Sequence, residues 1–249
     1  MSTNIAADKK QENGLMDIIK IVLQALALAI LVRIFLIQPF NIPSGSMKET
    51  LLIGDYLFVS KYSYGYSKYS IPGSFNLFNG RILGSQPKRG DVAVFRKPNQ
   101  VEIDYIKRVI GLPGDRIQVT NGQLFINGKA IPKKQVGTYY DEDENKHITI
   151  YEETLPEGLK YKVLDEKPNG YFDNTQEYVV PEGHYFMMGD NRDNSSDSRD
   201  QSNVGFVPFE NFIGRAEFIF FSADKNSSIA KFWTWPMTTR WSRIFNGVR

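Results

Sequence analysis

The stretch VEIDYIKRVI, Val101–Ile110, has the alternation of a β-strand and carries a lysine where an apolar residue is expected. Successive side chains of a strand point to opposite faces, so Lys107 falls on the apolar face, whereas Glu102, Asp104 and Arg108 share the other. Burying an ammonium group is costly and lowers its pKa, which makes a lysine amine available as a general base near neutral pH. The alternative is a lysine on an edge strand whose tip reaches water.

Runs rich in valine, isoleucine, tyrosine and phenylalanine recur on both sides of this strand, at Tyr56–Ser60, Asp91–Phe95 and Arg116–Thr120. The dipeptides Asn121-Gly122 and Asn127-Gly128 are typical of tight hairpin turns and flank a short apolar run. No long helical periodicity follows residue 40. The sequence therefore predicts a mostly β fold after the first 40 residues.

One apolar segment, residues 18–37, precedes the β region and is interrupted only by Lys20, Gln24 and Arg33. At about 1.5 Å per residue this length spans a hydrocarbon core of ~30 Å, with the two basic side chains reaching toward the interfaces. A cleaved signal peptide or a buried core helix is the alternative, but the bulky Ile37–Phe40 offers no small-residue cleavage site. We predict a single-pass transmembrane helix after a flexible tail of residues 1–17. Basic residues on both sides of the segment leave its orientation open.

The remaining chain divides by composition into one larger and one smaller β unit. Residues 38–128 and 177–222 are predicted to form the main domain, and the more polar residues 129–176 a smaller inserted subdomain.

The C-terminal tail, residues 223–249, combines three tryptophans, Trp233, Trp235 and Trp241, with basic residues that include Arg240 and Arg243. Aromatic and basic side chains together are typical of a membrane interface, so we expect an interfacial tail. A tail that packs on its own domain is the alternative.

The composition excludes several kinds of site and partner. There are no cysteines and only two histidines, His147 and His184, which excludes disulfides, thiolate metal sites, a cysteine nucleophile and a histidine-rich metal centre. A formal net charge of +2 gives no reason to expect nucleic acid as a partner. We expect neither a metal nor a cofactor.

Two further motifs contain groups that could carry chemistry. In Pro43-Ser44-Gly45-Ser46-Met47, Gly45 permits a tight backbone, so that the Ser46 hydroxyl projects and its amide faces a substrate carbonyl. In Gly189–Arg199, GDNRDNSSDSR, the aspartates alternate with Arg192 and Arg199, which can neutralise them internally. These arginines and the spacing count against a calcium loop. A solvated loop and a polar scaffold that braces an active site remain as alternatives.

Together these motifs resemble the sequence boxes of bacterial type I signal peptidases, which are serine proteases with a Ser–Lys dyad. Pro43–Met47 with Thr50–Asp55 resembles the serine box, Arg89–Phe95 with Tyr105–Asp115 the lysine box, and Gly189–Arg199 the final box. The resemblance implies an endopeptidase of the bacterial cytoplasmic (inner) membrane that removes signal peptides from exported preproteins, with its catalytic domain on the outer, periplasmic side. Its partners would be preproteins emerging from the translocase, and membrane lipid. The fold implied is a large, coiled β-sheet domain that carries a smaller inserted β domain.

The resemblance also implies a role for each matched residue. Ser46 would attack the scissile carbonyl and Lys107 would accept its proton. The Ser46 amide and the Ser44 hydroxyl would form the oxyanion hole. Ser195 would orient the Lys107 amine, and Asp197 with Arg199 would brace the site. Shallow pockets for Ala-like side chains, one and three positions before the cut, would be lined by Phe40, Ile42, Met47, Leu51, Tyr105 and Ile106.

The chain departs from the usual family pattern at two places. Glu49 stands where proline is common, which puts the shape of that turn in question, and Asp200–Gly205 replaces an aromatic residue followed by glycine. A self-cleaving LexA-like repressor is one competing hypothesis, but it would carry a DNA-binding unit instead of the apolar segment. A catalytically inactive, membrane-tethered β domain that binds exported chains is another, and the intact Ser46, Lys107 and Ser195 weigh against it.

Overall fold

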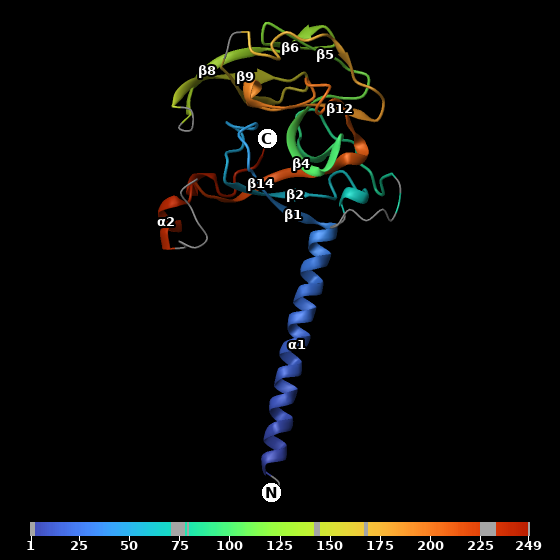
Figure 1. Ribbon diagram of the computed structural model, residues 1–249, viewed down its shortest axis with the longest axis vertical. Helices are drawn as coiled ribbons and strands as arrows, with labels where there is room; N and C mark the ends of the chain where they lie inside the picture. The colour runs from blue at the N-terminus through green and yellow to red at the C-terminus, as the bar shows by residue number, and fades with distance from the viewer. Residues whose placement is uncertain are drawn as a thin grey trace.

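The computed structural model describes residues 3–70, 78, 80–141, 145–166, 169–224 and 233–248. A long helix, α1 (Thr3–Phe35), projects from a domain built almost entirely of strands (Figure 1). The mostly β fold predicted from the sequence is confirmed, because no described helix after α1 is longer than the four residues of α2 (Trp235–Thr238).

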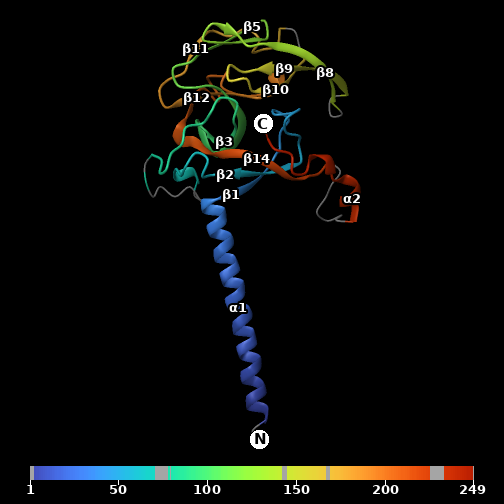
Figure 2. The same cartoon turned by 180° about the vertical axis from the view of Figure 1, so that it is seen from behind.

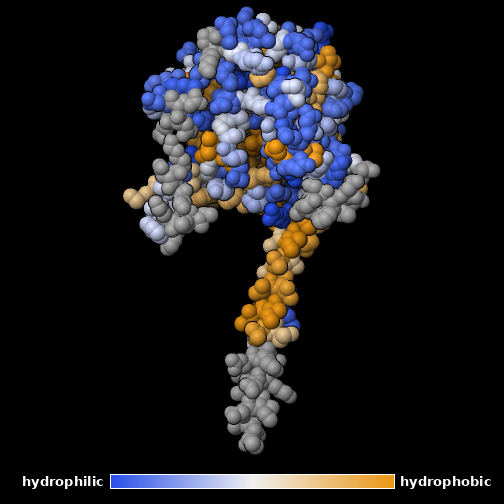
Figure 3. Space-filling model, in the orientation of Figure 1, coloured by the Kyte–Doolittle hydropathy of each residue, from blue (hydrophilic) through white to orange (hydrophobic). Residues whose placement is uncertain are grey.

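Within the described residues, α1 contains the one helix segment whose length and composition suit a membrane span. Gly14–Phe35 has 22 residues and a mean hydropathy of 2.4, and none of its most apolar stretch is buried by the rest of the protein. Figure 3 shows this apolar surface standing clear of the domain. At about 1.5 Å per residue the segment is about 33 Å long, enough for a hydrocarbon core.

The flexible tail predicted for residues 1–17 is wrong in one respect, because the helix already begins at Thr3. Ala6, Ala7, Lys9, Lys10 and Gln11 all have high helix propensity. Extending a helix that is already formed costs far less than nucleating one, so polar residues of this kind continue it.

A seven-stranded antiparallel sheet forms the layer next to α1, in the order β1-β2-β14-β3-β4-β12-β13 (Figure 1). The strands are β1 (Ile37–Asn41), β2 (Asp55–Ser60), β3 (Val92–Lys97), β4 (Gln100–Gly111), β12 (His184–Met188), β13 (Val207–Pro208) and β14 (Phe212–Ser222). β4 is strongly coiled. Its first half pairs with β3 alone, and β12 joins it only from Arg108 onward.

Two smaller sheets lie at the end of the domain away from α1, as both cartoon views agree (Figures 1 and 2). One contains β5 (Arg116–Thr120), β6 (Gln123–Ile126), β7 (Lys129–Ala130) and β11 (Tyr178–Val179). The other contains β8 (Lys133–Asp141), β9 (Lys146–Thr154) and β10 (Lys160–Asp165), which all fall inside the predicted insertion. The boundaries of the main domain and of the inserted subdomain stay predictions.

The two Asn-Gly dipeptides form the hairpin turns on either side of β6, as predicted. Asn121 and Gly122 have φ angles of 49° and 71°, and Asn127 and Gly128 have 53° and 76°. Two consecutive residues with positive φ match the twist of paired strands, and asparagine followed by glycine adopts this conformation at the lowest cost.

The C-terminal tail packs partly on the domain, which corrects the interfacial role expected for its two arginines. Arg243 and Arg240 both bind the buried carboxylate of Asp55, with Arg243 Nη2 2.6 Å from Asp55 Oδ2. A carboxylate without solvent needs charged donors, and these arginines are the ones in reach. Trp233 and Trp241 remain 65% and 64% exposed, so an interfacial role for the aromatic residues stays a prediction.

Candidate active site

Ser46 lies in the tight connection between β1 and β2, called here the nucleophile turn (residues 43–54). Lys48 N donates to Gly45 O over 3.0 Å and Leu51 N to Met47 O over 2.7 Å, so the chain folds back directly around the serine. Met47 and Leu51 are buried in the apolar core beneath the sheet. Their burial anchors the turn, because moving the serine would require pulling two core side chains out of close packing.

Lys107 reaches Ser46 from β4, 61 residues away in the sequence. Its Nζ lies 2.5 Å from Ser46 Oγ and 3.1 Å from Ile106 O, and the residue is only 4% exposed. The ammonium position also lies 5.2 Å from the centre of the Tyr105 ring, on the face predicted by strand alternation. No carboxylate forms an ion pair with Lys107 in the part of the chain that the structure describes.

Burial lowers the pKa of Lys107 to about 8, against an ordinary value of 10.5. Desolvation is the main cause, and the charge of Arg199 acts in the same direction. Asp197 and Asp190 act in the opposite direction but are outweighed. A substantial fraction of this amine is therefore neutral at mildly alkaline pH, which a base that accepts a serine proton requires.

The peptide that precedes Ser46 is held in place by Asn191. Asn191 Nδ2 donates to Gly45 O over 3.0 Å, and Asn191 N donates to Ser46 O over 3.1 Å. Because a trans peptide is planar, holding the Gly45 carbonyl also directs the Ser46 N–H to the opposite side. That N–H donates to none of the described residues, and Ser44 Oγ lies 3.5 Å from Ser46 Oγ. Two donors are thus available beside the hydroxyl.

The predicted supporting residues from the final motif surround this pair. Asp197 Oδ2 accepts the Gly189 amide over 3.0 Å, and both of its oxygens accept Arg199 at 2.9 Å. Burial alone raises the pKa of Asp197, but Arg199 outweighs it and the pKa lies below its ordinary value. Ser195 Oγ is buried and makes no hydrogen bond to a described residue, so its role in orienting Lys107 stays a prediction.

Gly189 is required where it stands. A Cβ at this position would lie 2.2 Å from Ser195 Oγ and 2.6 Å from Ser46 O, so any side chain would displace the serines. Its neighbour Asp190 continues toward the nucleophile turn. The final motif therefore packs directly against Ser46 and is not a solvated loop.

Arg108 lies on the opposite face of β4 from Lys107 and is buried as well. The side chain is fully buried, and its Nε and Nη2 donate to the Asp190 carboxylate over 2.9 and 2.7 Å. Asp190 also accepts Thr50 Oγ1 of the nucleophile turn over 2.5 Å. Arg108 thus links β4, the final motif and the turn that carries Ser46.

The sequence predicted that Arg192 and Arg199 neutralise the aspartates of the final motif. This is confirmed for Asp197, which binds Arg199, but Asp190 binds Arg108 of β4. Arg192 instead forms a two-bond ion pair at 2.6 Å with the buried Glu153 of β9, which also accepts Tyr161 OH over 2.5 Å. The sequence contained a signal for this. Gly189–Arg199 has three aspartates and only two arginines, so the arginines of the motif could not neutralise all of its aspartates.

The six predicted pocket residues divide by exposure. Ile42, Met47 and Leu51 are at most 3% exposed and belong to the core. Phe40, Tyr105 and Ile106 are half-buried. The first three can form only the floor of a substrate site, and the other three its walls.

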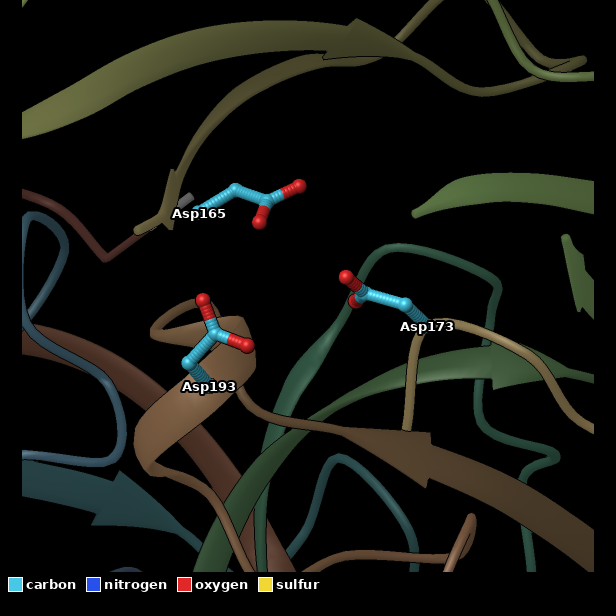
Figure 4. A group of neighbouring side chains, drawn as sticks. All are labelled: Asp165, Asp173 and Asp193. Carbon is cyan, nitrogen blue, oxygen red and sulfur yellow. The ribbon is translucent and has the colours of Figure 1, made fainter. Parts of the chain in front are cut away.

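Asp193 of the final motif forms a group of three carboxylates with Asp165 and Asp173, in which one oxygen of each lies within 4.8 Å of the others (Figure 4). Lys133 Nζ binds Asp165, Gly170 N donates to Asp173, and Glu166 N donates to Asp193, the last two over 2.7 Å. These contacts join the end of β10 to the short helical turn η2 (Arg192–Asn194).

Comparison with known proteins identifies the family of this chain. The family model described as signal peptidase, peptidase S26, matches residues 15–221. Signal peptidase I of Rickettsia prowazekii is 45% identical over 240 residues, and that of Rickettsia typhi 46%, in each case covering 90% of both chains. A crystal structure of a signal peptidase I from Enterococcus faecalis is 27% identical, covers 53% of this chain and 97% of its own, and has a TM-score of 0.31. The chain belongs to the signal peptidase family, peptidase S26.

Proposed function

We propose that this chain removes signal peptides from exported preproteins, cutting after small side chains, with Ser46 as nucleophile and Lys107 as general base. The observation that carries the proposal is the 2.5 Å separation of Lys107 Nζ and Ser46 Oγ in a buried site. A serine hydroxyl is a weak nucleophile until a neighbouring base accepts its proton. The depressed pKa of Lys107 supports the amine as that base.

The substrate would bind as an extended strand. In the described residues β1 pairs with β2 alone, and the first half of β4 pairs with β3 alone, so each presents an open edge. Ser46 follows the first edge by five residues, and Lys107 stands at the end of the second. An extended peptide that hydrogen-bonds to a free strand edge gains affinity from its backbone, whatever its side chains. This suits an enzyme that must accept many different preproteins.

Preference for small residues would follow from the filled floor of the site. Ile42, Met47 and Leu51 are packed in the core and leave no room beneath the substrate for a large side chain. Phe40, Tyr105 and Ile106 would border the shallow pockets. A larger substrate side chain would have to displace well-packed core residues, which typically costs 1–3 kcal/mol.

The chemistry would proceed through an acyl-enzyme. Ser46 Oγ attacks the scissile carbonyl carbon as its proton passes to neutral Lys107 Nζ. The resulting oxyanion is stabilised by the Ser46 N–H and the Ser44 hydroxyl. Lys107 then gives the proton to the departing amine of the mature protein. Water, deprotonated by the Lys107 amine, then hydrolyses the ester and releases the signal peptide, and Lys107 returns the proton to Ser46 Oγ.

The enzyme would be anchored in the cytoplasmic membrane with its β domain on the outer side. β1 begins at Ile37, directly after α1, and Tyr66 OH donates to Phe35 O over 2.6 Å, so the domain sits close to the membrane end of the helix. Preproteins emerge from the translocase on the outer side, and a site within reach of the lipid surface meets them there. A reporter fused at Arg249 should report an external location, and a cytoplasmic signal would contradict this orientation.

The test of the reaction uses the detergent-solubilised full chain and a precursor with an Ala-x-Ala site. Ser46→Ala should reduce processing by at least about 10³-fold, because no other group forms the acyl-enzyme. Its circular dichroism and melting temperature should match the parent chain. A Ser46→Ala variant with near-normal turnover would contradict the proposal.

A further inference from the structure

The nucleophile turn is held from outside at three consecutive residues that follow Ser46. Lys48 Nζ binds Asp141 Oδ2 of β8 over 2.6 Å, and Lys162 Nζ of β10 binds Glu49 Oε1 over 2.7 Å. Thr50 binds Asp190 of the final motif. The first two contacts come from the three-stranded sheet, which contributes no predicted catalytic residue. In Figure 1 the light-blue connection between β1 and β2 rises toward β8 and β9.

The Lys48–Asp141 contact differs from the other ion pair in its burial. The side chains of Lys48 and Asp141 are 6% and 1% exposed, whereas that of Lys162 is 54% exposed. Exposed pairs contribute little, but the members of a buried pair are held in one geometry, since separating them leaves a charge without solvent. Asp141, 93 positions away in the sequence, is therefore one of the groups that hold Lys48 in position.

Lys48 transmits this position to the backbone beside Ser46. A Cβ built on Gly45 would lie 2.9 Å from Lys48 Cε, so the lysine side chain runs closely over Gly45. Gly45 supplies the carbonyl of the peptide whose N–H belongs to Ser46. On the other side, Asn191 holds the same carbonyl. Gly45, the residue before Ser46, is thus contacted by both Asn191 and the Lys48 side chain.

The turn also needs such support because its backbone is strained. Glu49 has a φ of 79°, in the left-handed region that residues with a Cβ rarely adopt. A strained conformation persists only where the surrounding structure fixes it, and the residues on both sides of Glu49 carry such contacts.

We propose that Asp141 is a positioning residue for the peptidase reaction, acting through Lys48 to hold the Ser46 N–H and hydroxyl in their reactive geometry. The inserted sheet thereby becomes part of the catalytic apparatus. The proposal rests on the function proposed above, with Ser46 as nucleophile. Displacing a reacting group by about 1 Å can cost about 10²-fold in rate, so a contact of this kind acts mainly on kcat.

The test compares Asp141→Asn, Lys48→Met and the double variant in the solubilised full chain. Asp141→Asn keeps the size of the side chain but removes its charge, and Lys48→Met keeps most of the side chain over Gly45. The double variant removes both charges together, so neither is left buried without the other. Glu166→Gln is the control. Its pair with Lys146 of β9 has the same 2.6 Å separation, is more exposed at 28% and 20%, and involves no residue of the nucleophile turn.

We expect Asp141→Asn to lower kcat by at least about tenfold with KM changed less than about twofold. The double variant should recover the melting temperature of the parent chain and still have the low kcat, because the link to β8 is lost. Glu166→Gln should keep the parental kcat. A purely structural ion pair would not give a double variant with a parental melting temperature and a low kcat.

Recovery of both melting temperature and kcat in the double variant would overturn the proposal and leave the pair a stabilising contact only. An unchanged kcat in Asp141→Asn would overturn it as well. So would a double variant that fails to fold, since the pair would then be needed for the fold itself. Each of these outcomes leaves the loss of activity in Ser46→Ala intact, so failure of this inference is distinct from failure of the proposed function.

Discussion

The two faces of β4 hold neighbouring buried cations in opposite ways. Lys107 contacts a hydroxyl and a carbonyl, and burial lowers its pKa to about 8. Arg108 points the other way, and Asp190 outweighs the effect of burial, so that its pKa lies above the ordinary value. One strand thus carries a cation that can lose its proton beside one that cannot. Two causes separate them: guanidinium keeps its proton at any working pH, and the Asp190 carboxylate stabilises its charge further, whereas the lysine amine forms no ion pair with a described carboxylate.

Replacing Lys107 tests the reactive face and has the largest expected effect. Lys107→Arg retains a cation, but guanidinium stays protonated at any working pH, so it cannot accept the serine proton. We expect both Lys107→Arg and Lys107→Ala to lose at least about 10³-fold in the rate constant for precursor processing. Appreciable activity in Lys107→Arg would show that charge, and not basicity, is what Ser46 requires.

Replacing Arg108 tests the structural face, through stability. Arg108→Met leaves Asp190 buried without its cation, and breaking a buried pair on one side costs about 3–5 kcal/mol. Urea unfolding of the solubilised chain measures this loss. The double variant Arg108→Met/Asp190→Asn should recover part of it. A single variant as stable as the parent chain would mean that Asp190 is adequately solvated.

Ser195 sharpens the comparison, because its hydroxyl lies on the reactive side without a hydrogen-bond partner among the described residues. Ser195→Ala should lower the rate constant by about 10- to 100-fold, less than Ser46→Ala, if the hydroxyl orients the amine during the reaction. Its stability should be unchanged or higher, because an unsatisfied buried hydroxyl is removed. A parental rate would exclude the orienting role.

The pH dependence of the rate constant has the smallest expected effect of these tests. In the proposed mechanism the neutral amine of Lys107 is the reactive form, so the rate should rise with pH and reach half its maximum near the pKa of about 8. Between pH 7 and pH 9 this corresponds to an increase of about tenfold. His184→Gln should leave the profile unchanged. A rise that is complete by pH 7 and disappears in His184→Gln would contradict the lysine mechanism.

Much of the fold follows from local patterns. The β runs, the hairpin turns around β6 and the apolar helix were all predicted, because strand alternation, Asn-Gly turns and a long apolar segment act over a few residues. The predicted family is confirmed by the comparisons, and no finding supports the inactive β domain. The helical start of α1 was missed, since polar residues adopt a helix there only as a continuation of it.

What the sequence by itself determined is which chemical groups are present and where the backbone turns: a serine beside a flexible glycine, a lysine on an apolar strand face, and a dense polar motif. Only the tertiary structure decided which of them meet. Both faces of β4 are buried from Lys107 to Gly111, so Arg108 is a buried structural cation and Lys107 lies beside Ser46. The contact between Lys48 and Asp141 is likewise made only by the tertiary fold. Contacts across 61 to 93 residues and the pKa values they create depend on surroundings that no local pattern encodes.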